Sequence, residues 1–585
     1  MSTTGRQHLV RETLAMLRPY RGRVALALLT VAGALGTSLA GPALVEYLID
    51  DGLVHHHSMR VVDVAGGAYL LVAIASFAFT RWQTSLLSGT GELVLNDLRK
   101  RVFSHLLAQP MSFFDTESSG QLLSRMTADI DTLESLVQSG IGTFVMSIGL
   151  FVASIVVLVV IAPLLFVATA ACLVPIVVAA ARYRVASTSA YRAVRLRIGE
   201  TLASLDEGLA GVRVIQAFRQ EPAVGERFEA RNRDQLEAEL RTVRLASVFF
   251  PKVEGTGVLA TAVILLVGGV FVHLHLTSIG AVAAYVLYVG NLFNSIQSLS
   301  QLFDLLQSSG AALSTVVTLL DTEPAMADPE RPVPLPERGA LELAGVEFAY
   351  SGSRPVMSAV DLVIPPGEHV ALVGPTGAGK STLAKLVGRL YDPASGSVRF
   401  GGVDLRAASM TGLRRRIVVL PQEGFLFRGT VLDNILIGRP SAREQEVRQA
   451  VEALGLAERF DELPDGLDTE VGERGAHLSA GERQLVSLVR AALTDPAVLV
   501  MDEATSSVDP GTERWVETAL ARLSAGRTTI TVAHRLTIAE RADRVVVVDG
   551  GRVVEVGSHD ELVAAGGAYA QLYAAWQGAG QEGGG

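Results

Sequence analysis

Residues 374–381 read GPTGAGKS, a run of glycine, lysine and serine suited to holding phosphate groups. The run follows an apolar segment, residues 370–373, and precedes a helical pattern over residues 382–390. Backbone N–H groups of such a loop can turn towards phosphate oxygens, and the following helix adds a favourable dipole. Lys380 would neutralise phosphate charge and Ser381 would bind magnesium. Three glycines leave room for this approach, namely Gly374, Gly377 and Gly379.

Two adjacent carboxylates end a second apolar segment, residues 498–501. Asp502 is placed to hold magnesium through water, and Glu503 is placed to act as a general base that polarises the attacking water. Two acids at the end of a strand can also be simple surface residues. The phosphate-binding motif earlier in the chain favours the metal and base assignment.

Length and composition predict a membrane part beside this nucleotide-binding part. The 585 residues are too many for one compact core. Hydrophobic residues make up 49% and charged residues 19%, against about 25% charged in ordinary globular chains. Charges are sparse before residue 320 and ordinary after it. Basic residues form no compact tract, so nucleic acid is not expected as a partner.

Six stretches are long and apolar enough to cross a bilayer, which takes about 20 helical residues. A helix bundle in the core of a soluble protein is the alternative, but so many consecutive long runs disfavour it. The predicted spans are residues 24–49, 61–87, 141–162, 163–181, 250–272 and 278–306.

The placement of arginine and lysine predicts the orientation of these spans. Basic residues are dense after the second span, at residues 99–101, and between the fourth and fifth, at residues 182–244. The turns near residues 163 and 274 carry none. Positive residues stay cytosolic, so we expect a multi-pass protein of the cell membrane with both termini and the ATPase domain in the cytosol. Residues 1–23 are expected to form a retained cytosolic elbow, because they lack the pattern of a cleavable signal peptide.

The two inner loops, residues 88–140 and 182–249, are long and helical in pattern. We therefore expect the spans to continue below the membrane as rigid rods. Each loop contains a short turn that could touch another domain, residues 111–118 around Phe113 and residues 206–216 around Gly211. A solvated helical hairpin is the alternative for each.

Some polar residues of the membrane part could have functional roles. Glu46 and Glu254 would be costly at membrane depth, so each could line a substrate path or lie at the interface. Histidines on the predicted outer side, residues 55–57 with His273 and His275, are expected to be loop residues rather than a metal site. The single cysteine, Cys172, is expected to be a small core residue.

A proline-rich acidic segment, residues 321–339, marks a domain boundary because it cannot continue a helix. The predicted fold is therefore an α-helical six-span domain over residues 24–320 and an α/β P-loop NTPase domain over residues 340–577. Residues 578–585 are expected to form a tail.

The order and spacing of the motifs resemble those of the ATP-binding cassette exporters, in the half-transporter arrangement, over residues 10–577. The resemblance implies ATP and Mg²⁺ as ligands. Tyr350 looks like the aromatic residue that stacks on adenine, and Gln422 like the glutamine that senses the γ-phosphate and the metal. Asp509 matches the aspartate loop and His534 the switch histidine. Within the phosphate loop and its helix, the residues expected to contact nucleotide also include Thr376 and Thr382.

Residues 478–482 read LSAGE where the family signature is usually LSGGQ. The resemblance implies that Ser479 and Gly481 face ATP bound by a partner chain, and that residues 469–475, TEVGERG, lie near the inner-loop tips. Ser479 and Glu482 also match a helix capping box. Glu482 would either offset the helix dipole that should meet the γ-phosphate or point away and change little.

Intact Lys380, Glu503 and His534 beside an altered signature resemble one member of a heterodimeric exporter, so we favour a heterodimer over a homodimer. The expected function is ATP-driven export of hydrophobic or amphipathic compounds, such as drugs or lipids, by alternating access. One alternative is a same-fold importer of a ligand such as a siderophore. Another is a nucleotide-gated membrane protein that does not transport.

Overall fold

The computed structural model describes residues 16–55, 59–117, 119–324, 326, 328–350, 354–421, 424–502, 510–533 and 536–582. The chain divides into two compact units. The helical unit comprises Met1–Leu107 and Gly120–Thr322, and the sheet unit comprises Ala108–Ser119 and Glu323–Gly585.

Within the described residues, six helical segments are long and apolar enough to cross a membrane, which confirms the predicted six-span fold class. Helices suit this environment because they satisfy their backbone hydrogen bonds internally. The long helices are α2 (Arg21–Tyr47), α3 (Met59–Leu107), α7 (Ile141–Ile161), α8 (Pro163–Ala210), α10 (Glu221–His273) and α11 (Ile279–Leu320). Short pieces extend α2 and α7, namely η2 (Leu48–His55), α5 (Ser119–Ser124), η3 (Arg125–Asp129), α6 (Ile130–Ser135) and η4 (Leu136–Gly140).

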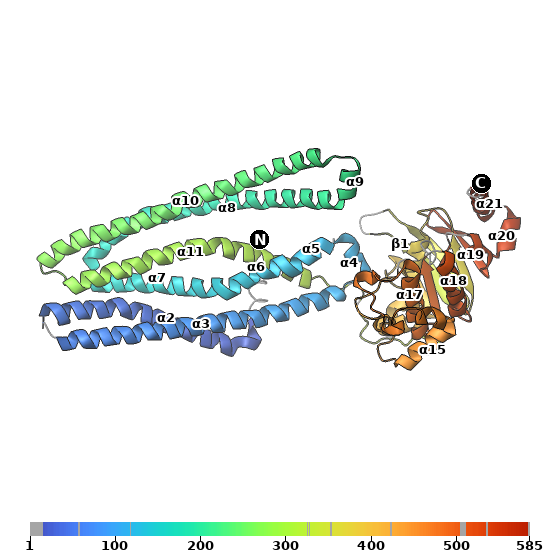
Figure 1. Ribbon diagram of the computed structural model, residues 1–585, viewed down its shortest axis with the longest axis horizontal. Coiled ribbons are helices and arrows are strands. Elements are labelled where there is room, and N and C mark those ends of the chain that lie inside the picture. Colours follow the sequence, from blue (N-terminus) through green and yellow to red (C-terminus); the bar gives the residue numbers. More distant parts are fainter. Residues whose placement is uncertain are drawn as a thin grey trace. The chain divides into compact units, whose positions relative to one another are not determined.

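The helices extend beyond the predicted spans, as the pattern of the inner loops indicated. Helices α8 and α10 run side by side, and α9 (Val212–Ala217) joins their ends (Figure 1). Gly211 separates α8 from α9, where a turn was predicted. The break between the third and fourth spans falls at Ala162, and Pro163 opens α8, a position where its missing N–H costs nothing.

Polar groups inside the helical unit are paired across helices. The hydroxyls of Tyr285 and Thr169 lie 3.0 Å apart. The Tyr288 hydroxyl donates to the Leu39 carbonyl at 2.6 Å. Such bonds hold helices together where apolar surroundings offer no other partner. Around them packs an apolar cluster with Leu158, Leu165, Ile264 and Leu292.

The first turn of α11 is capped by a side chain from η2. The Asp50 carboxylate accepts a hydrogen bond from the Gly280 N–H at 2.8 Å and another from the Ser278 hydroxyl. Ser278 itself accepts from the Ala281 N–H at 3.0 Å. A carboxylate at a helix N-terminus is favourable because it meets unpaired N–H groups and the positive end of the dipole.

The two carboxylates singled out in the membrane part differ in exposure. Glu46 on α2 is half-buried and Glu254 on α10 is exposed within the unit. Their predicted role in lining a substrate path stays a prediction. Cys172 is half-buried and packs against the apolar cluster of the unit, in agreement with its expected structural role.

The sheet unit contains two sheets. Five parallel strands, with an antiparallel strand at one edge, form a six-stranded sheet in the order β10-β9-β3-β8-β7-β6. Its strands are β3 (His369–Val373), β6 (Ile417–Leu420), β7 (Val498–Asp502), β8 (Thr528–Val532), β9 (Arg544–Asp549) and β10 (Arg552–Gly557). The antiparallel sheet has the order β2-β1-β4-β5, with β1 (Leu341–Phe348), β2 (Met357–Ile364), β4 (Ser395–Phe400) and β5 (Val403–Asp404).

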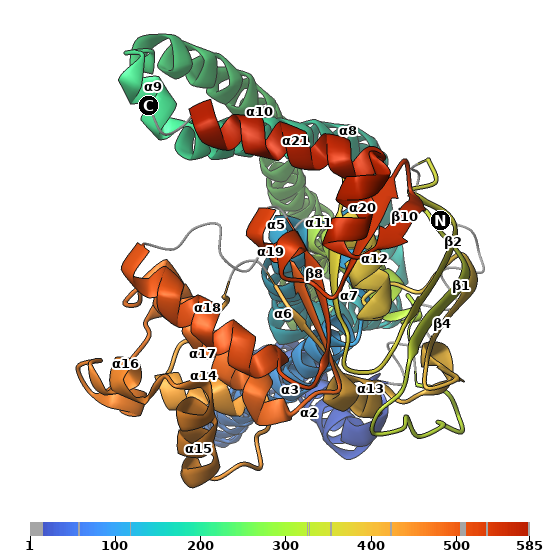
Figure 2. The same cartoon turned by 90° about the vertical axis from the view of Figure 1, so that its right-hand side faces the viewer.

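Helices cover the parallel sheet, and its central strands β3 and β8 are buried along almost their whole length because both faces are covered. The helices that follow β3 in the chain are α12 (Lys380–Val387), α13 (Met410–Arg416), α14 (Val431–Leu436), α15 (Glu444–Leu454), α16 (Ala457–Asp461), α17 (Ala480–Thr494), α18 (Pro510–Ser524), α19 (Leu536–Glu540), α20 (His559–Ala565) and α21 (Ala568–Glu582). Figure 2 shows β1, β2 and β4 together at one side of the unit and α14, α15, α17 and α18 at the other. This arrangement confirms the predicted α/β domain.

Gly280 is expected to be essential for the packing of α2 against α11. A Cβ at this position would lie 2.5 Å from the Glu46 carbonyl oxygen and 2.6 Å from the Asp50 carboxyl carbon. Gly280→Ala should therefore lower the thermal unfolding temperature of the detergent-purified protein, with a free-energy cost of about 1–3 kcal/mol from overpacking.

The matched control is Gly290→Ala in the same helix, where an added Cβ meets nothing within 4 Å. Gly290→Ala should be neutral or slightly stabilising, because alanine is favoured over glycine in a helix by about 1 kcal/mol. Equal unfolding temperatures for the two variants would contradict the close approach of α2 to α11.

Candidate nucleotide site

The phosphate loop lies between β3 and α12, at the carboxyl end of a central parallel strand. This is the edge of an open α/β sheet where ligands bind. Gly379 has φ 106° and precedes the first residue of α12, a backbone conformation that glycine adopts without strain. A Cβ on Gly374 would lie 2.0 Å from the Val548 carbonyl oxygen. The loop therefore depends on glycine at both ends.

Helix α12 begins at Lys380 and ends at Val387, whereas the sequence pattern predicted residues 382–390. The difference has a local cause. Gly379 places its backbone in the left-handed region directly before Lys380, and Gly388 follows Val387 as the C-cap residue. Ser381 and Thr382 therefore lie in the first turn of α12, where N–H groups are free for a ligand.

Lys380 is almost fully buried, with 6% of its surface exposed. Its ammonium group donates to the carbonyl oxygens of Gly374 at 2.8 Å and Pro375 at 2.9 Å. Burial lowers the pKa of this lysine, and the nearby Asp502 carboxylate opposes that shift. The positive charge is thus held inside the curve of the loop, where phosphate oxygens would be its natural partners.

Ser381 and Asp502 come together although 120 residues lie between them in the chain. The Ser381 hydroxyl donates to the Asp502 carboxylate at 3.3 Å. Asp502 ends β7, and β8 lies between β7 and β3 in the sheet. A hydroxyl and a carboxylate beside a phosphate loop are hard oxygen donors of the type that Mg²⁺ prefers.

Tyr350 follows β1 and lies beside the phosphate-loop helix. Its hydroxyl is 3.2 Å from that of Thr382. The ring packs edge-on against Phe348 and Tyr391, at 4.9 and 5.4 Å between ring centres. Lys385 lies over the Tyr350 ring at 5.8 Å. An aromatic side chain is thus fixed next to the loop.

The predicted inner-loop turn at residues 111–118 contains helix α4 (Met111–Thr116), which groups with the sheet unit. Its Asp115 carboxylate accepts a hydrogen bond from the Tyr391 hydroxyl. Burial and this hydrogen bond raise the pKa of Tyr391. A cavity of about 450 Å³ lies beside this contact and is lined by Tyr350 and Lys385 as well. The turn therefore lies close to the aromatic residue expected at the nucleotide base.

The altered signature opens helix α17. Ser479 and Glu482 form the predicted capping box, with the Glu482 carboxylate accepting from the Ser479 N–H at 2.7 Å. Sequence reasoning missed the other partner of Glu482. The Arg459 guanidinium donates to the same carboxylate at 2.7 Å and to Glu462 at 2.5 Å. Glu482 therefore bends back onto its own helix, and its charge is paired.

The remaining predicted site residues divide into two groups. Thr376 and Gly377 lie exposed in the phosphate loop, and Gly481 is buried in the first turn of α17. The others lie outside the described residues, namely Gln422, Glu503, Asp509 and His534. His56 and His57 also lie outside them. Among the described residues, no group of three or more His, Cys, Asp or Glu side chains could hold a metal ion.

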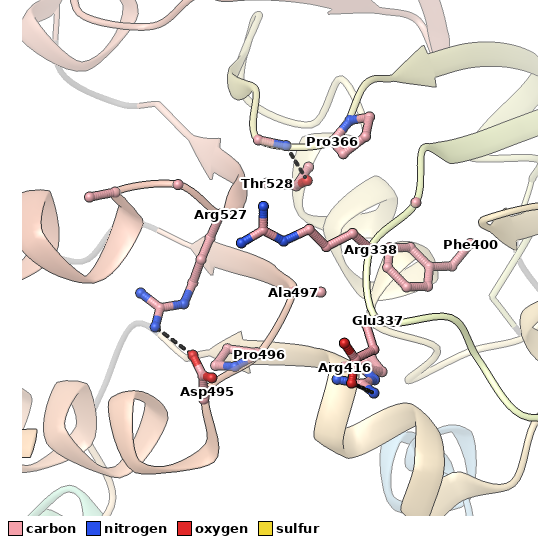
Figure 3. Close-up of a pocket in the computed structure, with 14 residues that line it drawn as sticks. Glu337, Arg338, Pro366, Phe400, Arg416, Asp495, Pro496, Ala497, Arg527 and Thr528 are labelled. Atoms are coloured by element: carbon pink, nitrogen blue, oxygen red, sulfur yellow. Dashed lines mark hydrogen bonds and ion pairs between the residues drawn. The ribbon is translucent and has the colours of Figure 1, made fainter.

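The sheet unit has a second cavity, of about 370 Å³ (Figure 3), and no residue of the phosphate loop lines it. It is lined by Ala497 and Thr528, which stand at the amino ends of β7 and β8, and by Arg527, which is paired with Asp495 at 2.7 Å. Ligands of parallel α/β sheets bind at the opposite, carboxyl edge. The phosphate-loop edge is therefore the candidate site.

Comparison with known proteins agrees with this geometry. Residues 24–296 match the family model described as ABC transporter transmembrane region, and residues 357–506 match the model described as ABC transporter. An uncharacterized ABC transporter ATP-binding protein of Bacillus subtilis is 34% identical over 96% of this chain and 93% of its own length. This chain belongs to the ABC transporter family. As an ABC transporter subunit with the membrane region first, it couples ATP hydrolysis to transport.

Two further relatives and one structure specify the type of transporter. A multidrug efflux ATP-binding/permease protein of Mycobacterium bovis is 37% identical over 96% of this chain and 47% of its own length. An ATP-dependent lipid A-core flippase of Thiobacillus denitrificans is 34% identical over 98% of this chain and 99% of its own length. The structure of a bacterial Atm1-family ABC exporter with ATP bound has a TM-score of 0.82 and 26% identity, covering 95% of this chain and 98% of that one. The ABC transporter is thus of the exporter type.

Replacing Lys380 should weaken nucleotide binding. Lys380→Met removes the charge held inside the loop, and the affinity for Mg-ATP should fall about 10- to 100-fold, as expected for losing a charge-assisted bond. The measurement is equilibrium binding of a fluorescent ATP analogue to the purified protein. Lys385→Met on the same helix is the control and should cost no more than about fivefold, because a half-buried cation 5.8 Å from the centre of an aromatic ring contributes little. Equal losses in both variants would contradict the assigned role.

Removing Arg459 should leave the charge of the Glu482 carboxylate unpaired. Arg459→Met should lower ATP turnover about fivefold, because an unpaired carboxylate would then offset the dipole of α17. Glu482→Gln alone should change turnover little, and Glu482→Gln in the Arg459→Met background should restore it. Arg448→Met, which breaks an exposed pair with Glu444 on α15, should have no effect. Failure of the double variant to recover would argue against the electrostatic explanation.

Proposed function

We propose that this exporter moves hydrophobic or amphipathic compounds, such as drugs or lipids, out of the cell. The observation that carries the proposal is the convergence of Lys380, Ser381 and Asp502 at the carboxyl edge of the sheet. The described part of the chain also has six helical segments long and apolar enough to cross a membrane. The relatives named for multidrug efflux and for lipid A-core flipping support the substrate class.

The proposed roles of Lys380, Tyr350, Ser381 and Asp502 rest on their positions, and those of Gln422, Glu503 and His534 rest on the family resemblance of the sequence motifs. Lys380 would bind the β- and γ-phosphates, and Tyr350 would stack on adenine from its place beside α12. Magnesium would be held by Ser381, Asp502 and Gln422, and it would neutralise phosphate charge when bound. Glu503 would accept a proton from the attacking water, and His534 would hold the γ-phosphate in position. Because catalysis of phosphoryl transfer is mostly positioning and electrostatics, few side chains suffice.

The second half of each ATP site is proposed to come from a partner half-transporter. Ser479, Gly481 and Asp509 would reach the nucleotide held by the partner chain. We propose a heterodimer, on the departure of the signature from LSGGQ. The pairing of Glu482 with Arg459 supports a milder electrostatic effect of this departure than a bare carboxylate would have. The alternative is a homodimer, and the experiment below distinguishes it from the heterodimer.

The sheet unit and both termini are proposed to lie in the cytosol. Arginine is concentrated after the second span and between the fourth and fifth, which is the distribution of cytosolic loops. Two bound ATP molecules would then close the ATPase domains, and the inner-loop turns would pass this closure to the spans. Shifting a two-state equilibrium from 1:99 to 99:1 takes about 5.5 kcal/mol of differential binding.

Vesicle transport with a catalytic variant tests the proposal. The protein, purified alone or with the product of an adjacent half-transporter reading frame, is reconstituted in lipid vesicles with its ATPase domains outside. A fluorescent amphiphile should accumulate inside only with Mg-ATP. Glu503→Gln should lower turnover and transport together by about 10²- to 10⁴-fold, the usual contribution of a general base. Glu517→Gln, an exposed carboxylate on α18, is the control and should retain both.

The outcomes separate the alternatives. Turnover by the chain alone would support a homodimer, and turnover only with a second chain would support the heterodimer. Transport in the opposite direction would support an importer. Binding of Mg-ATP with no turnover and no movement of any amphiphile would overturn the proposed function.

A further inference from the structure

A cavity of about 330 Å³ opens between α7, α8 and α11 in the helical unit. Its walls are mostly apolar and aromatic, including Phe151, Ile296, Leu299 and Phe303. Helices α7 and α11 pack side by side along it (Figure 1). The volume falls within the range of small-molecule sites, about 300–1,000 Å³. The cavity is thus large enough for part of an apolar molecule.

One charged side chain stands in the lining of this cavity. Arg184 on α8 is the sole ionisable cation among the residues that line it, and no carboxylate lines it. The Arg184 guanidinium carbon lies 4.7 Å from the centre of the Phe303 ring. The face of an aromatic ring attracts a cation at this distance. The charge is therefore held against the cavity wall.

The depth of Arg184 follows from helix geometry. From Pro163, which opens α8, to Arg184 the helix rises about 32 Å at about 1.5 Å per residue. From Ile279, which opens α11, to Phe303 the rise is about 36 Å. The hydrocarbon core of a bilayer is about 30 Å thick. Both helices therefore place the cavity where apolar chains meet headgroups, at the boundary proposed to be cytosolic.

An arginine in this position needs an anion. A guanidinium presents several N–H donors in a fixed plane, which suits a carboxylate or phosphate, and its contact with Phe303 leaves these donors at the plane's edge unused. Among the described residues, no acidic side chain forms an ion pair with Arg184. Arg184 is exposed within the helical unit, and its guanidinium lies against the Phe303 ring in the lining of an apolar cavity.

We propose that the cavity between α7, α8 and α11 binds an acidic amphiphile, with its carboxylate or phosphate on Arg184 and its apolar chain along Phe151, Ile296 and Phe303. The inference deepens the proposed export function and rests on it for the statement that the bound molecule is a substrate. It selects, among hydrophobic and amphipathic compounds, those with a negatively charged head.

A binding titration tests the proposal without turnover. The purified full-length protein, in nanodiscs of phosphatidylcholine, is titrated with dansyl-labelled undecanoic acid and with its methyl ester. The wild type should bind the acid more tightly. Arg184→Gln should weaken binding of the acid about tenfold, as expected for losing one charge-assisted hydrogen bond, and change binding of the ester by less than about twofold. Arg184→Lys should recover only part of the loss, because an ammonium lacks the planar donors.

A matched control lies two residues away. Arg182 is exposed, as Arg184 is, but does not line the cavity, so Arg182→Gln removes the same charge from the same helix and should leave binding of the acid unchanged. Ala180→Phe should fill the cavity and weaken binding of acid and ester alike. Propionate, which has the acidic head without the chain, should not compete.

Three results would overturn the proposal: equal affinity of the wild type for acid and ester, equal losses in Arg182→Gln and Arg184→Gln, or full competition by propionate. None of these depends on ATP. The binding titration and the vesicle experiment can give different results. If the acid binds as expected but no amphiphile moves with ATP in the vesicles, the cavity is a binding site, and only the proposed export of its ligand is wrong.

Discussion

Close backbone approach at the phosphate loop is the constraint on which the candidate site depends. Gly374 passes the Val548 carbonyl at a distance that leaves no room for a side chain, and Gly379 turns the chain into α12 through the left-handed region. These two positions orient the first turn of α12. Lys380 then points back into the loop, and Ser381 points towards Asp502 on β7. The backbone geometry of the loop therefore determines where the side chains that would bind phosphate lie.

The helical unit is shaped by a different constraint. Backbone groups in a bilayer must find partners within their own segment, so the unit is built from helices that cross and continue beyond the membrane. Polar side chains then supply the few specific contacts between helices. The Asp50 cap on α11 and the Tyr285–Thr169 contact are of this kind. Arg184 differs from them, because its charge lies against the Phe303 ring in the lining of a cavity and forms no ion pair among the described residues.

Helix α17, which begins at the altered signature, shows how the protein accommodates Glu482 at a position where the family usually has glutamine. A glutamate at a helix N-terminus that should meet phosphate would oppose its own function if its charge were free. Here Glu482 closes a capping box with Ser479 and pairs with Arg459. A paired carboxylate at 16% exposure carries much less field into the ligand space than a free one. The pairing of Glu482 therefore favours a small effect of the altered signature on the proposed ATP site.

The sequence by itself determined the features that depend on neighbouring residues. Apolar length predicted the six spans, glycine spacing predicted the phosphate loop, and the Ser479–Glu482 spacing predicted the capping box. Each follows from local backbone chemistry, which a single segment specifies. Helix ends were predicted less well, as at α12, because a glycine acts there through its φ angle and not through its pattern.

Only the tertiary structure decided which distant residues meet. The sheet order places β8 between β3 and β7 and so brings Ser381 to Asp502. Arg459 reaches Glu482 because α16 packs near the start of α17, and Arg184 reaches Phe303 because α8 and α11 share a cavity. No periodicity or spacing encodes such pairs. They arise from packing between elements far apart in the chain, which a sequence read residue by residue does not specify.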